Sequence, residues 1–472
     1  MQMNNSIGAL LIESACIDEG VHSYHEIHDW YRKIRDKYQY KVTRIPFSKM
    51  TQWHLNENSG DFSHESGGFF SVRGLQFSCE IKGQKETWQQ PIIDQPEIGI
   101  LGFATRTIEG VLHLLVQAKM EPGNSNLIQL SPTVQATRSN YMRLHGGRPT
   151  RYLELFLDTK SLILDQLHSE QGTKYFKKRN RNMICIAPDN HLEEHDEYLW
   201  LTLGQISKLC SHENMVHLDT RSILGGINYY YEGINNQNIE KKLNICGYGA
   251  GVLKSICCDI NSGTHQYQDI IHWITGEKFS RRIHQEFLGL SNIEDWVCGE
   301  NEIAQIDKKY FSIYAVSVEA ENREVSSWNQ PLIHTHKGGV YLLISQEIDG
   351  ILHFLIQCRC EPGLIDVVEL APTVQCNPKN HDQLNIPYSE YISKSSDASK
   401  VVFDSILAEE GGRFIDSDQR HLIIHIEKDI NIEIVGSYRW MTLRQIQEIG
   451  RYSNYLNIEL RSILSCVSPL LQ

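Results

Sequence analysis

The chain has 472 residues, of which 41% are hydrophobic and 22% are charged, a composition typical of an ordinary globular protein. Its formal net charge of −13 argues against a surface that binds nucleic acid or an anionic membrane, because both need a basic field. No stretch reaches the ~20 apolar residues of a membrane span, and no basic leader precedes the apolar run at residues 8–12. We therefore expect a cytoplasmic protein that binds neither nucleic acid nor membrane.

The chain repeats itself once, at a constant offset of 240 residues. The offset relates WQQP (88–91) to WNQP (328–331), IEGVLHLLVQAKMEPG (108–123) to IDGILHFLIQCRCEPG (348–363), LSPTVQ (130–135) to LAPTVQ (370–375), WLTL (200–203) to WMTL (440–443), and RSIL (221–224) to RSIL (461–464). Two copies at this spacing indicate a tandem duplication of a domain, because a solenoid needs at least three short repeats. We place the first repeat at residues 1–224, a connector at 225–264 and the second repeat at 265–472.

Each copy has a mixed α and β pattern, which predicts the α+β fold class. Glu109-Gly110 and Asp349-Gly350 punctuate β-rich flanks and predict one hairpin in each copy. On the strand that follows residue 110, the even-numbered residues 112–120 form an apolar face, and His113, Leu115, Gln117 and Lys119 form the other. This second face is either a half-solvated surface with an ion pair to the next glutamate, or a ligand-facing wall.

Near the end of each copy, Thr202-x-x-Gln205 and Thr442-x-x-Gln445 have the spacing of a capping box at the start of an amphipathic helix. Arg221 and Arg461 follow these helices, and we expect both side chains to be solvated.

The twelve cysteines include no CxxC pair of the kind that zinc sites favour, and we expect Cys358 and Cys360 to be buried, reduced thiols. The GxGxxG, GxxxxGK[ST], HExxH and GxSxG motifs are absent from the sequence. Glu409-Glu410-Gly411-Gly412 matches only part of a Nudix box, without its preceding glycine or its magnesium-binding carboxylates. We therefore expect neither a metal ion nor a cofactor.

Several strings resemble the NDP-hexose 2,3-dehydratase family over nearly the whole chain. They are HESGGFFSV (64–72), WQQPIIDQPEIGILGF (88–103), QAKMEPGN (117–124), QLSPTVQATRSNY (129–141), HGG (145–147), YLELF (152–156) and the LAPTVQ copy. The resemblance implies two Nudix-like domains that lack the hydrolase's metal box, a homodimer, and action on dTDP-4-keto-6-deoxyglucose in deoxysugar biosynthesis. It also implies a downstream 3-ketoreductase as a partner.

The two copies differ where the resemblance is most specific. After LAPTVQ the second copy reads CNPKNH (376–381), whereas the first copy reads ATRSNY (136–141). HESGGFF has only the weak counterpart DKKYF (307–311). We therefore expect the working site in the first repeat and a decayed or auxiliary nucleotide site in the second.

The implied reaction needs a base and hydrogen-bond donors. The 4-keto group acidifies the C3 hydrogen, so that a base can form an enolate, and the C2 hydroxyl then leaves with help from an acid. Our candidates for acid and base are Tyr141, His145 and His64, with Glu121 as a fourth that the adjacent Pro-Gly turn marks as structural.

The expected substrate-binding residues are polar groups near the two TVQ strings. Thr133 and Gln135 can read a pyrimidine edge, and Arg138, Arg148 and Arg151 offer the guanidinium groups that a diphosphate favours. The set is completed by Lys119, Asn140, Thr373 and Gln375.

Two other functions remain open at this point. The same pocket and duplication would serve a non-catalytic protein that binds nucleotide sugars. A Nudix-type hydrolase would instead cleave the pyrophosphate, and would require magnesium.

Overall fold

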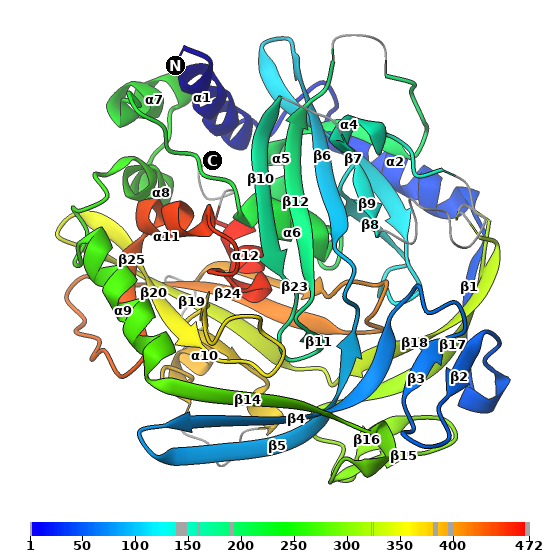
Figure 1. The fold of residues 1–472 in the computed structure, drawn as a ribbon. Coiled ribbons are helices and arrows are strands. Elements are labelled where there is room, and N and C mark those ends of the chain that lie inside the picture. Colours follow the sequence, from blue (N-terminus) through cyan, green and yellow to red (C-terminus); the bar gives the residue numbers. More distant parts are fainter. Residues whose placement is uncertain are drawn as a thin grey trace.

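The computed structural model in Figure 1 describes residues 2–137, 149–157, 161–188, 192–321, 323, 325–380, 386–394 and 401–467. Within these ranges the protein is a mixed α/β structure, in which most elements of the first half recur in the second half. The predicted mixture of helices and sheets in two tandem parts is confirmed.

Each repeat has a central mixed sheet. In the first repeat the strand order is β10 (Leu162–Ser169), β12 (Arg179–Ile186), β6 (Gly99–Ile108), β7 (Val111–Met120) and β13 (Tyr198–Thr202), with β8 (Ile128–Ser131) on β7 and β9 (Val134–Ala136) on β6. In the second repeat the order is β23 (Val401–Ala408), β24 (Asp418–Ile426), β19 (Gly339–Ile348), β20 (Ile351–Arg359) and β21 (Glu369–Ala371), with β22 (Val374–Cys376) on β19 and β25 (Tyr438–Thr442) on β20.

Both predicted hairpins are present. Ile108 pairs with Val111 across Glu109 and Gly110, whose φ angles of 51° and 85° suit a two-residue turn of type I′. Asp349 and Gly350 repeat this geometry, with φ angles of 51° and 74°. The turn fixes the register of each hairpin, and therefore decides which side chains of β7 and β20 face the core.

The predicted apolar face of β7 lies in the main hydrophobic core, together with residues from the helices behind it.

The cysteines are all unpaired thiols. Cys358 is buried as expected, but Cys360 is only partly buried. Cys360 lies one residue beyond the end of β20.

A second pair of sheets is built by exchange of strands between the repeats. β1 (Tyr40–Ile45) of the first repeat pairs with β17 (Phe311–Ala320), and β14 (Arg281–Leu288) of the second pairs with β4 (Ser71–Ile81). The sheet around β4 also contains β2 (Trp53–Leu55), β3 (Phe62–His64), β5 (Gln84–Asp94) and β11 (Tyr175–Phe176); that around β17 contains β15 (Trp296–Cys298), β16 (Ile303–Gln305) and β18 (Ser327–Thr335). Each repeat therefore completes a sheet of the other, as the long strands in the lower part of Figure 1 show.

The helices follow the same duplication. They are α1 (Gln2–Cys16), α2 (Tyr24–Lys37), α4 (Glu154–Leu157), α5 (Leu203–Leu209), α6 (Leu218–Gly225), α7 (Asn236–Leu243), α8 (Gly247–Cys257), α9 (Tyr267–Phe279), α10 (Glu390–Lys394), α11 (Leu443–Gly450) and α12 (Ile458–Ser465), with 3₁₀ turns at Phe47–Lys49, Leu290–Asn292 and Pro378–Asn380. Among the described residues, no helix is both long enough and apolar enough to cross a membrane.

Helix α8 lies within the predicted connector but matches α1 of the first repeat. Ser14 Oγ donates to the Leu112 carbonyl at 2.6 Å, and Ser255 Oγ donates to the Leu352 carbonyl at 2.6 Å. The connector therefore contains a counterpart of α1. The bounds of the two repeats and the connector given above stay a prediction.

Both predicted capping boxes are confirmed. The Thr202 and Thr442 hydroxyls each accept from the backbone N–H three residues later, and Gln205 and Gln445 accept from the N–H of the capping residue. These boxes fix the start of α5 and α11 directly after β13 and β25.

The two arginines expected to be solvated are instead fully buried, where α6 packs against α12. Arg221 donates to the Ala408 carbonyl of the second repeat. Arg461 donates to Ser222 Oγ at 3.0 Å and to the Ser169 carbonyl at 2.7 Å, both in the first repeat. The expectation was wrong because the partner groups lie in the other repeat, and local sequence carries no sign of them.

We expect Arg221→Ala to lower the free energy of unfolding by about 3 kcal/mol or more, because it leaves buried acceptors without a donor. Arg181→Ala is the control, since its ion pair with Asp165 is partly exposed, and it should cost about 1 kcal/mol or less. Equilibrium unfolding in urea measures both losses. Equal losses in the two variants would contradict a special role for the buried arginine.

Candidate active site

A pocket of about 140 Å³ opens on the face of β7 that carries Gln117 and Lys119. Its wall also includes Thr133, Gln135 and Arg151, all of which were predicted from the sequence to bind substrate. Lys119 is only 9% exposed. Of the two interpretations of this face, the structure therefore favours a wall that lines a pocket over a solvated surface.

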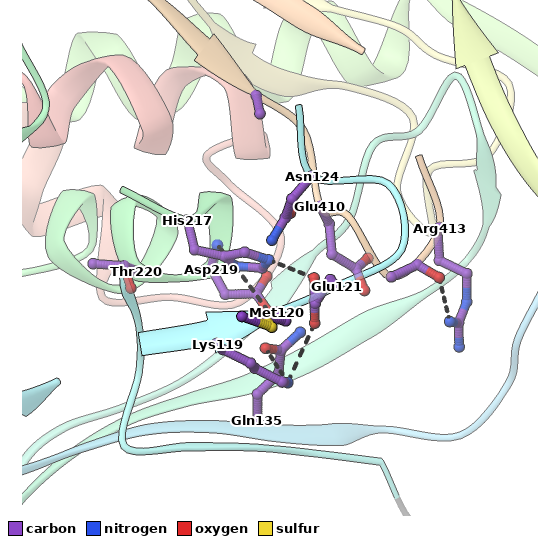
Figure 2. Close-up of polar contacts among 12 residues, drawn as sticks. Lys119, Met120, Glu121, Asn124, Gln135, His217, Asp219, Thr220, Glu410 and Arg413 are labelled. Atoms are coloured by element: carbon purple, nitrogen blue, oxygen red, sulfur yellow. Dashed lines mark hydrogen bonds and ion pairs between the residues drawn. The ribbon is translucent and has the colours of Figure 1, made fainter. Parts of the chain in front are cut away.

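Lys119 is held in place by two oxygen atoms. Its Nζ donates to Gln135 Oε1 at 2.6 Å and lies 3.2 Å from Glu121 Oε1, as Figure 2 shows. Lysine has three donors, so one N–H direction is left for a group in the pocket. The arrangement presents a fixed positive charge to an anion or to an oxygen on which negative charge develops.

Glu121 is oriented by His217, which is completely buried at the start of α6. The Asp219 backbone N–H donates to His217 Nδ1, so the ring proton is on Nε2 and faces Glu121 Oε2 at 2.8 Å. Burial alone would raise the pKa of Glu121, but His217 and Lys119 hold it well below its usual range. Glu121 is therefore an ionised partner of Lys119.

Two charged residues of the second repeat lie near the turn that carries Glu121, although neither is among the residues that line the first pocket (Figure 2). Glu410 and Arg413 follow β23 and reach the first repeat where Gly123 N donates to the Gly411 carbonyl at 2.8 Å. A Cβ atom on Gly123 would lie 1.5 Å from the Phe414 carbonyl oxygen, so only glycine fits at the end of the Glu-Pro-Gly turn.

The same contact occurs in reverse at the second repeat. Gly363 N donates to the Gly172 carbonyl at 2.6 Å, which equates Gly172 with Gly411. Glu170-Gln171-Gly172 therefore corresponds to Glu409-Glu410-Gly411 at an offset of 239, one residue less than elsewhere. The same offset of 239 relates β10 to β23 and β12 to β24, and its difference of one residue from the offset of the repeated strings conceals the match in the sequence.

A second pocket, of about 180 Å³, lies in the second repeat and shares two equivalent positions with the first, Arg359 (Lys119) and Gln375 (Gln135). Its wall includes Arg359, Gln375, Glu409 and Glu459 from the second repeat, and Gln171 and Lys174 from the first. The residues at the equivalent positions are Lys119, Gln135, Glu170, Asp219, Glu410 and Arg413, of which Lys119 and Gln135 line the first pocket. We call these two sets of six positions the second site and the first site.

The two sites differ in how their acidic groups are paired. In the second site, Glu361 Oε1 accepts from Arg359 at 2.9 Å and from Gln375 at 2.9 Å, and Asn457 stands where the first site has His217. Burial lowers the pKa of Lys174 to about 8. The second site thus keeps the frame but lacks the buried imidazole.

Carboxyl groups in the first site have raised pKa values because they are buried near one another. Burial raises the pKa of Asp219 well above its ordinary value, and the neighbouring Glu410 and Glu170 raise it further. Burial and Glu410 also raise the pKa of Glu170 to about 7. Such a group can both accept and release a proton near neutral pH.

A larger pocket, of about 360 Å³, lies beyond Tyr198 between α2 and β13. Arg106, Trp30 and Trp200 line it. We assign the chemistry to the first site instead, because its frame recurs in the second repeat. Arg106 of the larger pocket does not recur: its counterpart in the second repeat is Gln346, whose side-chain amide donates to the Glu427 and Ile430 carbonyls.

The two predicted threonines are used by the backbone. Thr133 Oγ1 accepts from Ala104 N at 2.9 Å and donates to the Leu115 carbonyl, and Thr373 makes the equivalent contacts in the second repeat. These hydroxyls fix β7 and β20 against the strands beside them.

The other described candidates lie at different distances from the pocket. Gln135 and Gln375 line the first and second pockets, and Arg151 pairs with Glu197 at 3.1 Å in the wall of the first. His64 lies on β3, where Ser66 and the rings of Trp53 and Phe69 surround it, and it is not part of the described lining of the first pocket. Burial lowers its pKa.

Five predicted residues lie outside the described part of the chain. They are Arg138, Asn140, Tyr141, His145 and Arg148. Their roles stay predictions.

Sequence reasoning did not select His217, Asp219, Glu170, Glu410 or Arg413. The histidine and aspartate directly precede the repeated RSIL string, which was a usable signal. The other three could not be assigned to the site because they come together only through contact between the repeats. Among the described residues, no cluster of three or more His, Cys, Asp or Glu side chains could hold a metal ion.

Comparison with known proteins places the chain in a family. The family described as NDP-hexose 2,3-dehydratase matches residues 24–227 and 267–467. A protein of Streptomyces violaceoruber is 37% identical over 94% of this chain and 96% of its own length, and one of Amycolatopsis orientalis is 36% identical over 96% and 92%. A third, of Saccharopolyspora spinosa, is 36% identical over 97% and 93%, and all three are named dTDP-4-dehydro-6-deoxy-alpha-D-glucopyranose 2,3-dehydratase. The chain belongs to the NDP-hexose 2,3-dehydratase family and is a hydro-lyase.

Proposed function

We propose that this protein eliminates water across C2 and C3 of dTDP-4-keto-6-deoxy-D-glucose to give a dTDP-3,4-diketo-2,6-dideoxyhexose. The observation that carries the proposal is the match to three relatives named for this substrate over at least 92% of their lengths. The first site supports it, because Lys119 is a fixed cation at the pocket wall, and Glu170, whose counterpart lines the second pocket, has a pKa raised to about 7 by burial and Glu410. No redox step is needed, since the substrate already carries the C4 ketone.

Lys119 is suited to stabilise the enolate oxygen at C4 or a phosphate oxygen. Its charge is fixed by Glu121 and Gln135, so little reorganisation accompanies the reaction. Arg151 is suited to the diphosphate, because its guanidinium group is partly exposed at the pocket wall. The diketone product is reactive, which supports a 3-ketoreductase as the next enzyme.

We further propose that each repeat is a Nudix-like domain, with bounds near 1–224 and 265–472. The central mixed sheet and the Glu-Pro-Gly turn after its long hairpin support this assignment. Homodimer assembly and a cytoplasmic location stay predictions.

The deciding experiment is an incubation of the protein with dTDP-4-keto-6-deoxyglucose, EDTA and a 3-ketoreductase, followed by mass spectrometry. We expect a product that is lighter by one water before reduction. Release of thymidine monophosphate on addition of magnesium would instead indicate a pyrophosphate hydrolase. Binding without any turnover would indicate a carrier of nucleotide sugars.

We expect Gln135→Ala to weaken nucleotide binding and lower turnover, because it removes a polar group of the pocket and frees Lys119 from its nearest acceptor. Gln375→Ala, the matched variant in the second site, should change the rate by less than about threefold, or under ~1 kcal/mol, because Gln375 lies outside the working site. Titration with dTDP and steady-state rates measure the two effects. Loss of turnover in Gln375→Ala alone would reverse the assignment of the working copy.

Tyr141→Phe and His145→Ala test the predicted acid and base. If either residue transfers a proton, its loss should lower kcat by roughly 10²-fold or more, with a smaller effect on KM. Substrate with deuterium at C3 should then react more slowly whenever the chemical step limits turnover. Rates that stay within about threefold of the parent for both variants would exclude both residues as the base, because proton transfer contributes far more than that.

A further inference from the structure

The structure distinguishes two buried glutamates that occupy equivalent positions. Glu170 is 4% exposed, and its Oε1 accepts from Asn180 at 2.6 Å. Its Oε2 is buried and has no hydrogen-bond partner among the described residues. An unpaired buried carboxylate oxygen is costly, so this atom calls for an explanation.

The equivalent glutamate of the second site, Glu409, has both oxygens occupied. Tyr341 donates to Oε1 at 2.6 Å, and Gln171 donates to Oε2 at 2.6 Å. In the first site the position of Tyr341 is Leu101, which has no donor, and the position of Gln171 is Glu410. Both substitutions leave Glu170 free of the contacts that hold Glu409.

Glu410 also changes the charge around Glu170. Its Oε2 accepts from the Tyr175 hydroxyl at 2.8 Å, which holds its side chain. Lys178 and Arg461 also face Glu170 and favour its ionised form, and Asp219 is a further acidic neighbour. Burial and Glu410 outweigh the two cations. Arg461 is already committed to backbone carbonyls and Ser222.

The position of Glu170 corresponds to one that lines a pocket in the second repeat. Glu409 and Gln171 both line the second pocket, next to Arg359. Glu170 and Glu410 occupy the same two positions in the first site, next to Lys119. Glu170 is not among the residues that line the described first pocket. A ligand held in the first site at the place that the second pocket occupies in the second repeat would contact the unpaired oxygen of Glu170.

We propose that Glu170 is the proton-transfer residue of the dehydration, and that Glu410 of the second repeat is a positioning residue that tunes it. This inference rests on the proposed function. The Glu170 carboxylate takes the C3 proton, and the electrons of the C3–H bond form the C3=C4 bond of an enolate whose charge rests on the C4 oxygen.

The second half of the reaction returns this proton. The enolate electrons re-form the C4 carbonyl and the C2=C3 double bond, and the C2–O bond breaks. The departing hydroxyl takes the proton from the Glu170 carboxyl group and leaves as water, so that Glu170 is again ionised. The enol at C3 then tautomerises to the 3,4-diketone, and no oxidant or reductant is consumed.

The first test compares Glu170→Gln with Glu369→Gln. Glu369 is a matched control, because it is buried, has one unpaired oxygen and has a pKa raised by burial to about 7. Neither Glu369 nor its first-repeat counterpart Gln129 lines any of the three pockets, whereas Glu409, the counterpart of Glu170, lines the second. We expect Glu170→Gln to lower kcat by roughly 10²-fold or more, the scale of a lost general base, while dTDP binding changes little. Glu369→Gln should stay within about threefold of the parent, and Glu170→Asp should recover part of the rate.

The second test does not depend on the stability of a Glu170 variant. A general base must be ionised, so kcat/KM of the parent should rise with pH through the pKa of Glu170, near 7. Glu410→Gln removes a neighbouring negative charge and should move this limb to lower pH by on the order of one unit. A merely structural role of Glu410 would lower the rate without moving the limb.

The outcomes separate the two proposals. A parent protein that releases no water from the 4-keto sugar would overturn the proposed function and this inference together. A parent that is active, with Glu170→Gln within about threefold of it, or with Glu410→Gln leaving the acid limb in place, would overturn the inference alone.

Discussion

The close approach of the two Glu-Pro-Gly turns to the other repeat is the constraint on which the structure depends. A Cβ atom on Gly123 would meet the Phe414 carbonyl at 1.5 Å, and one on Gly363 would meet the Tyr175 carbonyl at 1.7 Å. The exchanged strands β1 and β14 act in the same direction, since each completes a sheet of the other repeat. The duplicated halves therefore cannot separate without exposing backbone groups and breaking both sheets.

This reciprocal contact also explains how two copies of one domain can diverge in chemistry. Each copy donates part of the other's site, so a substitution of Gln171 in the first repeat alters the second site, and one of Glu410 in the second repeat alters the first. The difference between Gln171 and Glu410 is of this kind. An amide locks Glu409 in the second site, whereas a carboxylate lies beside Glu170 in the first. Fusion of the copies into one chain permits such asymmetry, which identical subunits could not have.

Features set by neighbouring residues could be predicted from the sequence. The Glu109-Gly110 hairpin, the apolar face of β7 and the Thr202 capping box all depend on contacts within a few residues or on strand alternation. Pocket residues on that strand, such as Lys119, followed from the same alternation. The burial of Arg221 and the proximity of Glu410 to Glu170 could not be predicted, because both depend on residues about 200 positions away in the sequence. In addition, the offset of 239 conceals the equivalence of Glu170 and Glu409.

The carboxyl groups of the first site have a thermodynamic consequence that the interface between the repeats must offset. A glutamate whose pKa is raised by folding holds a proton in the folded state that the unfolded chain has released. For Glu170 this holds between the ordinary glutamate pKa of ~4.3 and its folded value near 7, so its contribution lowers stability progressively across that range. Asp219 acts in the same direction, whereas Glu121, with its lowered pKa, contributes stability that is lost only in acid. A site with Glu121 alone would be more stable but would lack a group able to exchange a proton near neutral pH. The buried contacts of Arg221 and Arg461 at the interface of α6 and α12 are well placed to offset that cost, because they hold together the two segments that carry these carboxyl groups.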